Sequence, residues 1–360
     1  AILPILILPT MVGALIEYSG FTESEAGWLA TAGFVGSALG AIVIGLRIRH
    51  IDPRRLVIAG VLALALFDGL SALVSYIPIP LFVAFRFLSG LGGAAAYAAV
   101  VASIATMASP ERGYGTFTVF QFGISAIGLY GLPYVLPLVG AAGMFVLMAI
   151  AAAATLLLTT AVVHREAAAS DQAIELHMLL RPAAILAMLG IGLYETANFM
   201  QYTYAERIGL GFGLTNVQIG ETLGLATLLG VPAGLAVVWL GDRFGQLMPL
   251  LAAIACSVGG HILLLNSSAP VMYVIASCMI GGGWAFGLAY FYSIEARLDP
   301  GGSVVVVGGF FTSCGSAIGP ALAAMLVKPD VFDDVLLAAM GVFALVGVVV
   351  TLAVFCARKR

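Results

Sequence analysis

The feature of this sequence that most limits its fold is a series of long apolar segments separated by short polar connections. At ~1.5 Å per residue, each segment is about long enough for an α-helix to cross a hydrocarbon layer of ~30 Å. The segments do not alternate polar and apolar residues with a period of two, which argues against a membrane β-barrel. We expect an all-α membrane protein with twelve transmembrane helices, at residues 1–18, 24–46, 56–76, 80–107, 114–138, 140–163, 182–205, 215–240, 247–266, 270–294, 303–327 and 332–357.

The composition also indicates a lipid environment. Hydrophobic residues make up 62% of the chain and charged residues 9%, whereas a soluble domain carries about 25% charged residues. Cys256, Cys278, Cys314 and Cys356 lie inside apolar segments, without the spacing of metal ligands or of a redox pair. The four histidines are scattered. We therefore expect neither a metal site nor a cofactor.

Basic residues predict the orientation of the helices. If both termini lie in the cytoplasm, the cytoplasmic connections and the C-terminus hold twelve bases, and the opposite face holds only Arg207 and Lys328. This is the positive-inside pattern, so we expect a multi-pass protein of the cytoplasmic (inner) membrane with both termini cytoplasmic. The twelve bases are Arg47, Arg49, Arg54, Arg55, Arg112, Arg165, Arg181, Arg243, Arg297, Arg358, Lys359 and Arg360.

An eight-residue pattern occurs twice in the chain. GFTESEAG at residues 20–27 is followed 193 residues later by GLTNVQIG at residues 213–220, with glycine first and last, threonine third and Glu or Gln sixth. The same offset aligns the basic turn at 47–55 with the turn at 241–246. Two homologous halves are the economical interpretation.

The repeat predicts a domain organisation of two pseudo-symmetric six-helix bundles. The N-terminal bundle is expected at residues 1–163 and the C-terminal bundle at 182–360. A polar cytoplasmic linker at 164–181 joins them, and its residue spacing allows a short amphipathic helix on the membrane surface. Because Ala1 is not methionine and opens directly into an apolar run, we also expect a short N-terminal tail to precede it.

Four stretches together resemble the major facilitator superfamily. They are the repeated octapeptide, GDRFG at residues 241–245, RFLSGLGGA at 86–94 and SPERGYG at 109–115. The resemblance covers the whole chain, and it implies a secondary transporter in which two six-helix halves rock about a site near the middle of the membrane. Segment 117–137 lacks the glycine–proline pattern of the family's drug exporters, which makes a drug antiporter less favoured.

The resemblance also implies a cytoplasmic gate built from helix ends and ion pairs. In the first half the turn reads RIRHIDPRR, with Arg49 and Asp52 where the family has Asp and Gly, so the lock carries over fully only in the second half. Glu295 and Arg297 are expected to make gate contacts with neighbouring helices. The candidate gate residues taken from the motifs are Asp242, Arg243, Gly245, Arg54, Arg55 and Arg112.

Polar residues inside the expected helices are candidates for the transport path, because lipid does not tolerate them unpaired. Arg86 is interpreted either as a snorkelling structural residue or as an anchor for an anionic substrate or partner of a protonatable acid. Glu195 shares a helix face with Asn198 and Tyr202, and Gln201 lies close by. We expect this stripe to line a cavity, with Glu195 as a candidate for binding a proton or substrate.

Four further residues complete the candidate path. Asp68, which the repeat offset sets opposite His261, is either a protonation site or a buried neutral acid that packs helices by a hydrogen bond. Gln121 is a candidate cavity residue. Trp284 and Tyr290 belong to an aromatic helix, whose rings either pack among helices or present a face to a flat solute. Together with Arg86, these rings favour an organic anion as substrate.

These observations separate the function classes. The chain has no HExxH or GxSxG motif and no filter-like loop, so neither an enzyme nor a channel is expected. We predict a monomeric, proton-coupled secondary transporter of a small-molecule solute in the lipid bilayer, working by symport. The alternatives are a proton-driven exporter of drugs or metabolites, or a receptor-like protein that binds without transport. Topology explains the basic turn at 47–55, so no nucleic-acid partner is expected.

Overall fold

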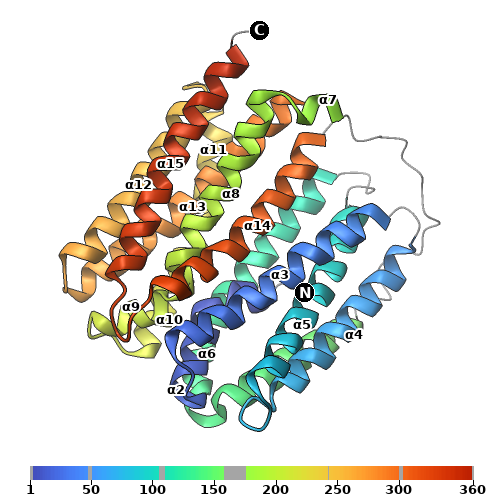
Figure 1. The fold of residues 1–360 in the computed structure, drawn as a ribbon, viewed down its shortest axis with the longest axis vertical. Coiled ribbons are helices and arrows are strands. Elements are labelled where there is room, and N and C mark those ends of the chain that lie inside the picture. Colours follow the sequence, from blue (N-terminus) through green and yellow to red (C-terminus); the bar gives the residue numbers. More distant parts are fainter. Residues whose placement is uncertain are drawn as a thin grey trace. The chain divides into compact units, whose positions relative to one another are not determined.

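The computed structural model describes residues 3–47, 51–104, 110–157, 176–241, 243–299 and 303–358, and these are nearly all helical (Figure 1). The first helices along the chain are α1 (Leu3–Leu6), α2 (Leu8–Ser19), α3 (Glu23–Arg47), α4 (Pro53–Ser71), α5 (Ile79–Ile104) and α6 (Pro110–Thr155). The remainder are α7 (Leu176–Leu179), α8 (Pro182–Thr203), α9 (Ala205–Gly211), α10 (Asn216–Leu228), α11 (Gly230–Leu240), α12 (Leu247–Asn266), α13 (Pro270–Leu298), α14 (Ser303–Leu326) and α15 (Asp333–Arg358).

Nine helices in the described part of the chain are long and apolar enough to cross a membrane. Three features account for the difference from the twelve expected. Helix α2 has only 12 residues. Helix α4 carries three charges, Arg54, Arg55 and Asp68. Helix α6 runs for 46 residues through two expected helices, 114–138 and 140–163. Twelve crossings therefore stay a prediction.

Gly140 divides α6 into two helical parts. Its backbone angles, φ 63° and ψ −170°, lie in a region that is essentially open to glycine alone. A side chain at this position would force the backbone out of that region, so the sharp change of direction depends on this residue. The kink coincides with the boundary expected between residues 138 and 140.

Contacts divide the chain into two units, Ala1–Asp171 and Gln172–Arg360. In the first unit α5 packs against α3 and α4, and α6 packs against α2 and α4. In the second unit α8 packs against α14 and α15, and α13 packs against α10, α11 and α12. Figure 1 shows α15, α8 and α14 as neighbours. Most of the expected linker lies outside the described residues, which include only its short helix α7.

The glycine that opens each copy of the octapeptide has the same backbone conformation. Gly20 has φ +71° and Gly213 has φ +74°, both in the left-handed region that glycine enters without steric cost. Each glycine closes the preceding helix, which is the usual place for a left-handed residue. The invariant first position of the pattern is thus explained by backbone geometry.

The threonine of each copy begins the next helix in the same way. The Thr22 hydroxyl accepts a hydrogen bond from the Glu25 backbone N–H at 3.2 Å, and the Glu25 carboxylate accepts one from the Thr22 N–H at 2.9 Å. Thr215 and Gln218 make the equivalent pair at 3.3 and 3.0 Å. This reciprocal arrangement is a capping box, which requires Thr and Glu or Gln three residues apart.

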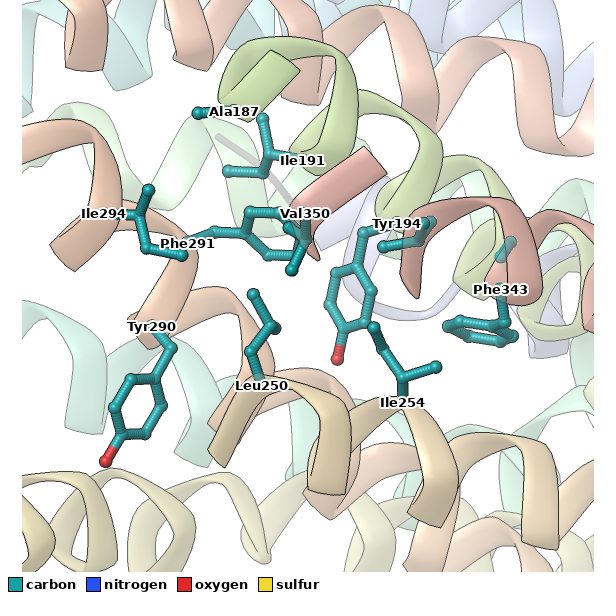
Figure 2. Close-up of a cluster of buried hydrophobic side chains, with 12 residues drawn as sticks. Ala187, Ile191, Tyr194, Leu250, Ile254, Tyr290, Phe291, Ile294, Phe343 and Val350 are labelled. Carbon is teal, nitrogen blue, oxygen red and sulfur yellow. The ribbon is translucent and has the colours of Figure 1, made fainter. Parts of the chain in front are cut away.

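Figure 2 shows the main apolar core of the second unit, to which α8, α12, α13 and α15 contribute. The Tyr194 ring centroid lies 5.2 Å from that of Phe291 and 5.8 Å from that of Phe343. Leu250 and Ile254 of α12 fill the space between these helices. The core fixes α8 in place, and Glu195 follows directly on the buried Tyr194.

Candidate functional site

Glycines allow α8 and α14 to approach each other closely. A Cβ added at Gly315 would collide with the Gly192 carbonyl group, and one added at Gly319 would lie 2.7 Å from the Thr196 carbonyl oxygen. Small residues of this kind are typical of tight helix contacts in membranes. The same contact places Glu195 in the interface, because its Cβ lies 3.0 Å from where a Gly315 Cβ would be.

The Glu195 carboxyl group is held by three helices. Its side chain is only 2% exposed. The Trp284 indole of α13 donates a hydrogen bond to Oε1 at 2.9 Å, and the Ser316 hydroxyl of α14 lies 3.5 Å from Oε2. An ionised carboxylate away from water is costly unless it is well hydrogen-bonded. With one close neutral donor and one distant one, this group is suited to taking up and releasing a proton.

Asn198 lies one turn after Glu195 on the same side of α8. Its amide nitrogen donates to the Tyr194 carbonyl oxygen at 2.8 Å. Its Oδ1 is buried and has no hydrogen-bond partner among the described residues. Because a buried amide oxygen is normally satisfied, this atom is open to a water molecule or to a polar group of a solute.

The other two residues of the predicted stripe on α8 differ in their burial. Gln201 is buried, whereas Tyr202 is half-buried. The Tyr202 ring meets the Phe199 ring edge-on at 6.0 Å. The structure therefore brings the polar groups of Glu195, Asn198 and Gln201 into the interior of the second unit. That they line a cavity stays a prediction.

The two aromatic candidates of α13 have different environments. Trp284 contacts Glu195 directly. Tyr290 belongs to the apolar core in Figure 2, where its hydroxyl donates to the Gly241 carbonyl oxygen at 3.3 Å and its ring packs 5.1 Å from Phe286. Only Trp284 therefore joins the polar cluster around Glu195.

A second buried polar cluster lies in the first unit, between α4 and α5. Arg86 Nη1 and Asp68 Oδ1 form an ion pair at 2.7 Å, and the two side chains are 3% and 1% exposed. The Ser89 hydroxyl donates to the same Asp68 oxygen at 2.7 Å, and Ser71 lies 3.4 Å from Arg86 Nη1. The guanidinium group also lies 5.2 Å from the centre of the Phe145 ring.

The contacts in this cluster favour one interpretation for each of its two charged residues, Arg86 and Asp68. Arg86 is buried, so it does not snorkel to the surface. Its charge is balanced by Asp68, which supports the role of partner to an acid rather than that of a free anchor for an anion. Asp68 in turn links α4 to α5 by accepting hydrogen bonds from two side chains. Gln121 of α6 is half-buried.

Sequence analysis missed four residues of these clusters. Ser71 follows Asp68 by three positions and Ser89 follows Arg86 by three, so each shares a helix face with that charged residue and was open to detection from sequence. Ser316 and Phe145 come from other helices than the groups that they contact. Their roles depend on helix packing, and nothing local in the sequence indicates them.

The gate residues of the first unit belong to the start of α4. Asp52 caps this helix by accepting a hydrogen bond from the Arg54 backbone N–H at 3.1 Å. Arg55 Nε lies 3.8 Å from Asp52 Oδ2, and the arginine side chain is largely exposed. An exposed pair at this distance contributes little to stability. A gate role for Arg54 and Arg55 stays a prediction.

The gate residues of the second unit lie between α11 and α12. Arg243 stacks above the Trp239 ring at 5.2 Å, and Gly245 has φ +66°. Asp242 lies outside the described residues, as does the side chain of Arg112. The expected lock between Asp242 and its neighbours therefore stays a prediction.

Glu295, near the end of α13, is a fully buried carboxyl group. Its side chain is 0% exposed, and neither carboxyl oxygen has a hydrogen-bond partner in the described part of the chain. Both oxygens lie against the backbone of Gly308 in α14, where any larger residue would collide with them. The expected contact with a neighbouring helix is thus present, but it is a packing contact.

The described residues contain no group of three or more His, Cys, Asp or Glu side chains arranged to hold a metal ion. The family assignment follows from the sequence as a whole. The profile of the Major Facilitator Superfamily matches residues 3–324. The chain belongs to this superfamily. A solved structure of a variant of the nucleoside transporter NupG has the same fold, with a TM-score of 0.81, 11% identity, and coverage of 98% of this chain and 96% of that one.

Two curated proteins are similar to this Major Facilitator chain over most of its length. The gentisate transporter of Corynebacterium glutamicum is 26% identical over 90% of this chain and 77% of its own length. The Bacillus subtilis protein named "Putative niacin/nicotinamide transporter NiaP" is 22% identical over 97% of this chain and 90% of its own. These relatives are transporters and not enzymes, and this chain is a multi-span membrane transporter of the same superfamily.

Proposed function

We propose that this chain is a proton-coupled secondary transporter that carries a small organic anion, an aromatic carboxylic acid, across the cytoplasmic membrane. Two six-helix halves, at residues 1–163 and 182–360, rock about a central site, and proton and anion move in the same direction. The chain works as a monomer with both termini in the cytoplasm, and the linker at 164–181 joins the halves. Twelve crossings, six in each half, are part of this proposal.

The observation that carries the proton coupling is the environment of Glu195. In a transporter, an acid buried among three helices is a proton-binding group when its charge is only partly compensated. Glu195 meets this description, because Trp284 supplies one good hydrogen bond and Ser316 only a distant one. Asn198 adds a buried oxygen without a partner among the described residues, one turn away on the same helix.

The substrate class rests on the two curated relatives and on the aromatic residues. One relative is named for gentisate and the other for niacin and nicotinamide. Gentisate and niacin are both small aromatic rings that carry one carboxylate, and nicotinamide is the neutral amide of niacin. Trp284 brings an indole ring to the same carboxyl group that we assign to the proton. A flat ring with one negative charge fits a site that offers an aromatic face and a protonatable acid. Arg86 is not assigned to the anion, because Asp68 already balances its charge.

Transport by the purified protein in proteoliposomes tests this function. Radiolabelled nicotinate and gentisate are offered outside, with nicotinamide as a neutral compound that differs from nicotinate only in the carboxylate. With one proton per anion, an outside pH one unit lower than inside supports about tenfold accumulation of the acid. We expect nicotinate or gentisate to accumulate, nicotinamide not to accumulate, and Glu195→Gln to abolish the effect.

Weak acids also cross bare lipid when they are protonated, so protein-free liposomes under the same gradient give the background. The Glu195→Gln protein gives a second background with an equal amount of folded protein. Saturable accumulation above both backgrounds supports the proposal. Solute binding without any movement contradicts it and favours a receptor, and movement of solute against the direction of the proton contradicts symport and favours an exporter.

A further inference from the structure

Helix α14 contacts both of the deeply buried carboxyl groups of the second unit's helices α8 and α13. Glu195 meets it at Gly315 and Ser316, and Glu295 meets it at Gly308. The two contacts lie about two turns apart, or ~11 Å along the helix axis. Glu195 is in the middle of its helix, whereas Glu295 is three residues from the end of α13 that the charge pattern predicts to be cytoplasmic.

Two hydroxyl groups of α14 lie between these two contacts, each hydrogen-bonded to a backbone carbonyl oxygen of the same helix. The Ser316 hydroxyl donates to the Thr312 carbonyl oxygen at 3.0 Å, and the Thr312 hydroxyl donates to the Gly308 carbonyl oxygen at 3.0 Å. Residues four apart lie on the same side of a helix. The series from Glu195 through Ser316 and Thr312 therefore leads, turn by turn, to the residue against which Glu295 packs.

The geometry at Ser316 suits transfer of a proton out of Glu195. A hydroxyl has one proton to donate and lone pairs that accept. The Ser316 hydroxyl has two acceptors for its one proton, the Thr312 carbonyl oxygen at 3.0 Å and Oε2 of Glu195 at 3.5 Å; when the proton is on the nearer one, the Ser316 lone pairs face Oε2. A neutral Glu195 would point its proton at Ser316, while its other oxygen accepts from Trp284.

The environment of Glu295 suits a group that receives a proton. Both oxygens are buried without partners among the described residues, so an ionised carboxylate there would be costly and the neutral acid is favoured. The charged side chains of α8, α13 and α14 are Glu195, Glu295 and Arg297. The Asp299 carboxylate, beyond the end of α13, accepts a hydrogen bond from the Val304 backbone N–H at 3.1 Å.

We infer that Glu195 and Glu295 are the two stations of one proton path along α14, with the Ser316 and Thr312 hydroxyls between them and water molecules completing the steps from Ser316 to Thr312 and from Thr312 to Glu295. A proton passes from Glu195 Oε2 to the Ser316 oxygen, and the proton that Ser316 held leaves for a water molecule. That water passes a proton to Thr312, a second water carries the proton that Thr312 held, and the Glu295 carboxylate gains one. Glu195 ends ionised and Glu295 neutral, and Glu295 then releases its proton to the cytoplasm. This inference rests on the proposed function and assigns the exit of its proton.

The ratio of two transport rates in proteoliposomes tests the path. Net accumulation of nicotinate under a proton gradient requires proton release at the inner side, whereas exchange of labelled for unlabelled nicotinate at equal pH does not. We expect Glu295→Gln to lower the ratio of accumulation to exchange by up to about tenfold at one pH unit. Thr312→Val and Ser316→Ala should lower it several-fold, and Glu295→Asp should restore most of it.

Ser313→Ala is the matched control. The Ser313 hydroxyl also donates to the carbonyl group four residues earlier, Gly309, at 3.0 Å, but it lies ~100° further round the helix than Thr312. We expect its ratio to equal that of the wild type. A wild-type ratio in Glu295→Gln, or an equal loss in Ser313→Ala and Thr312→Val, would overturn the inference. If Glu295→Gln does not fold, Thr312→Val against Ser313→Ala decides.

A measurement without substrate separates this inference from the proposed function. Infrared difference spectra of the purified protein between two pH values show the carbonyl band of each carboxylic acid that gains a proton. We expect one such band to be missing in Glu295→Gln and another in Glu195→Gln. If the wild-type protein transports no acid but its spectrum contains both bands, the proposed substrate is wrong and the assignment of Glu195 and Glu295 as proton-binding groups is still supported. If Glu295→Gln removes no band, the path is wrong.

Discussion

At the scale of single residues, buried acids of this protein differ by what lies beside them. Asp68 has a guanidinium group and a hydroxyl at 2.7 Å each, so its charge is compensated in place. Glu195 has one indole N–H at 2.9 Å, and Glu295 has no partner in the described part of the chain. The same functional group is therefore a structural ion-pair partner in one unit and a candidate proton carrier in the other.

The ion pair leads to a prediction about stability. Removing one member of a buried pair leaves an uncompensated charge, which costs about 3–5 kcal/mol, whereas replacing both members costs much less. We expect Arg86→Met and Asp68→Asn each to lower the melting temperature of the detergent-solubilised protein, and the double variant to recover most of the loss. Ser89→Ala, which removes one hydrogen bond worth about 1 kcal/mol, is the control. A double variant as unstable as both single variants added together would contradict a direct pairing.

At the scale of helices, the position of each glycine decides its effect. Gly315 and Gly319 face α8 and allow the contact that places Glu195, whereas nothing lies within 4 Å of a Cβ added at Gly309 on the same helix. The repeated octapeptide shows the same principle at helix ends, where a left-handed glycine and a capping box occur together in both copies. The effect of a glycine therefore depends on whether another helix lies against it or its φ is positive, and not on the number of glycines in the chain.

Two substitutions on α14 test this difference. Gly315→Ala introduces a Cβ that collides with the Gly192 carbonyl group, so we expect a lower melting temperature and reduced transport as α8 and α14 move apart. Gly309→Ala enters open space, and alanine favours a helix over glycine by up to about 1 kcal/mol, so stability should be unchanged or slightly higher. Thermal unfolding of the two variants in the same detergent measures this. Equal destabilisation by both would show that the close contact is not what requires glycine at 315.

At the scale of the whole molecule, the number of membrane crossings decides on which side of the membrane the basic residues lie. Nine helices of the described residues satisfy the requirements for a span separately, and twelve crossings follow only if α2, α4 and both parts of α6 cross as well. The charge pattern supports this count, because shifting the topology by one helix would remove the excess of basic residues on one face. Each of the two units contains an apolar core of its own.

Labelling from one side of the membrane tests the twelve-helix topology. In a background where the four native cysteines are replaced, we expect Lys328→Cys to react with a membrane-impermeant maleimide on intact cells. Arg55→Cys should react only after the cells are permeabilised, because the basic turn is predicted to be cytoplasmic. Both residues are exposed, so neither is protected by packing. Reaction of Arg55→Cys but not of Lys328→Cys on intact cells would show that the orientation is the opposite one. Reaction of both variants on intact cells would show that the number of crossings between the two residues differs from the prediction.

Much of the helical architecture was open to prediction, because it depends on properties that are local in the sequence. Lipid requires continuous apolar runs, glycine is favoured where φ is positive, and a capping box requires two residues three positions apart. The apolar segments, Gly20, Thr22 and their counterparts at 213 and 215 could therefore be interpreted from the sequence. Glu195 could be selected as well, since an acid in the middle of an apolar segment needs a reason to be there.

Tertiary structure decided which side chains meet. Arg86 could be interpreted as an anion anchor from the sequence, but the structure shows Asp68 of α4 beside it. The sequence did not distinguish the roles of Trp284 and Tyr290, whereas in the structure Trp284 contacts Glu195 and Tyr290 belongs to the apolar core. Glu295 was expected to contact a neighbouring helix, and only the structure shows that this contact is with the backbone of Gly308 in α14. These contacts depend on how helices from distant parts of the chain rotate and pack against each other. The sequence by itself determined the helices and the polar residues that they carry, and packing determined the partner of each polar residue and hence its chemistry.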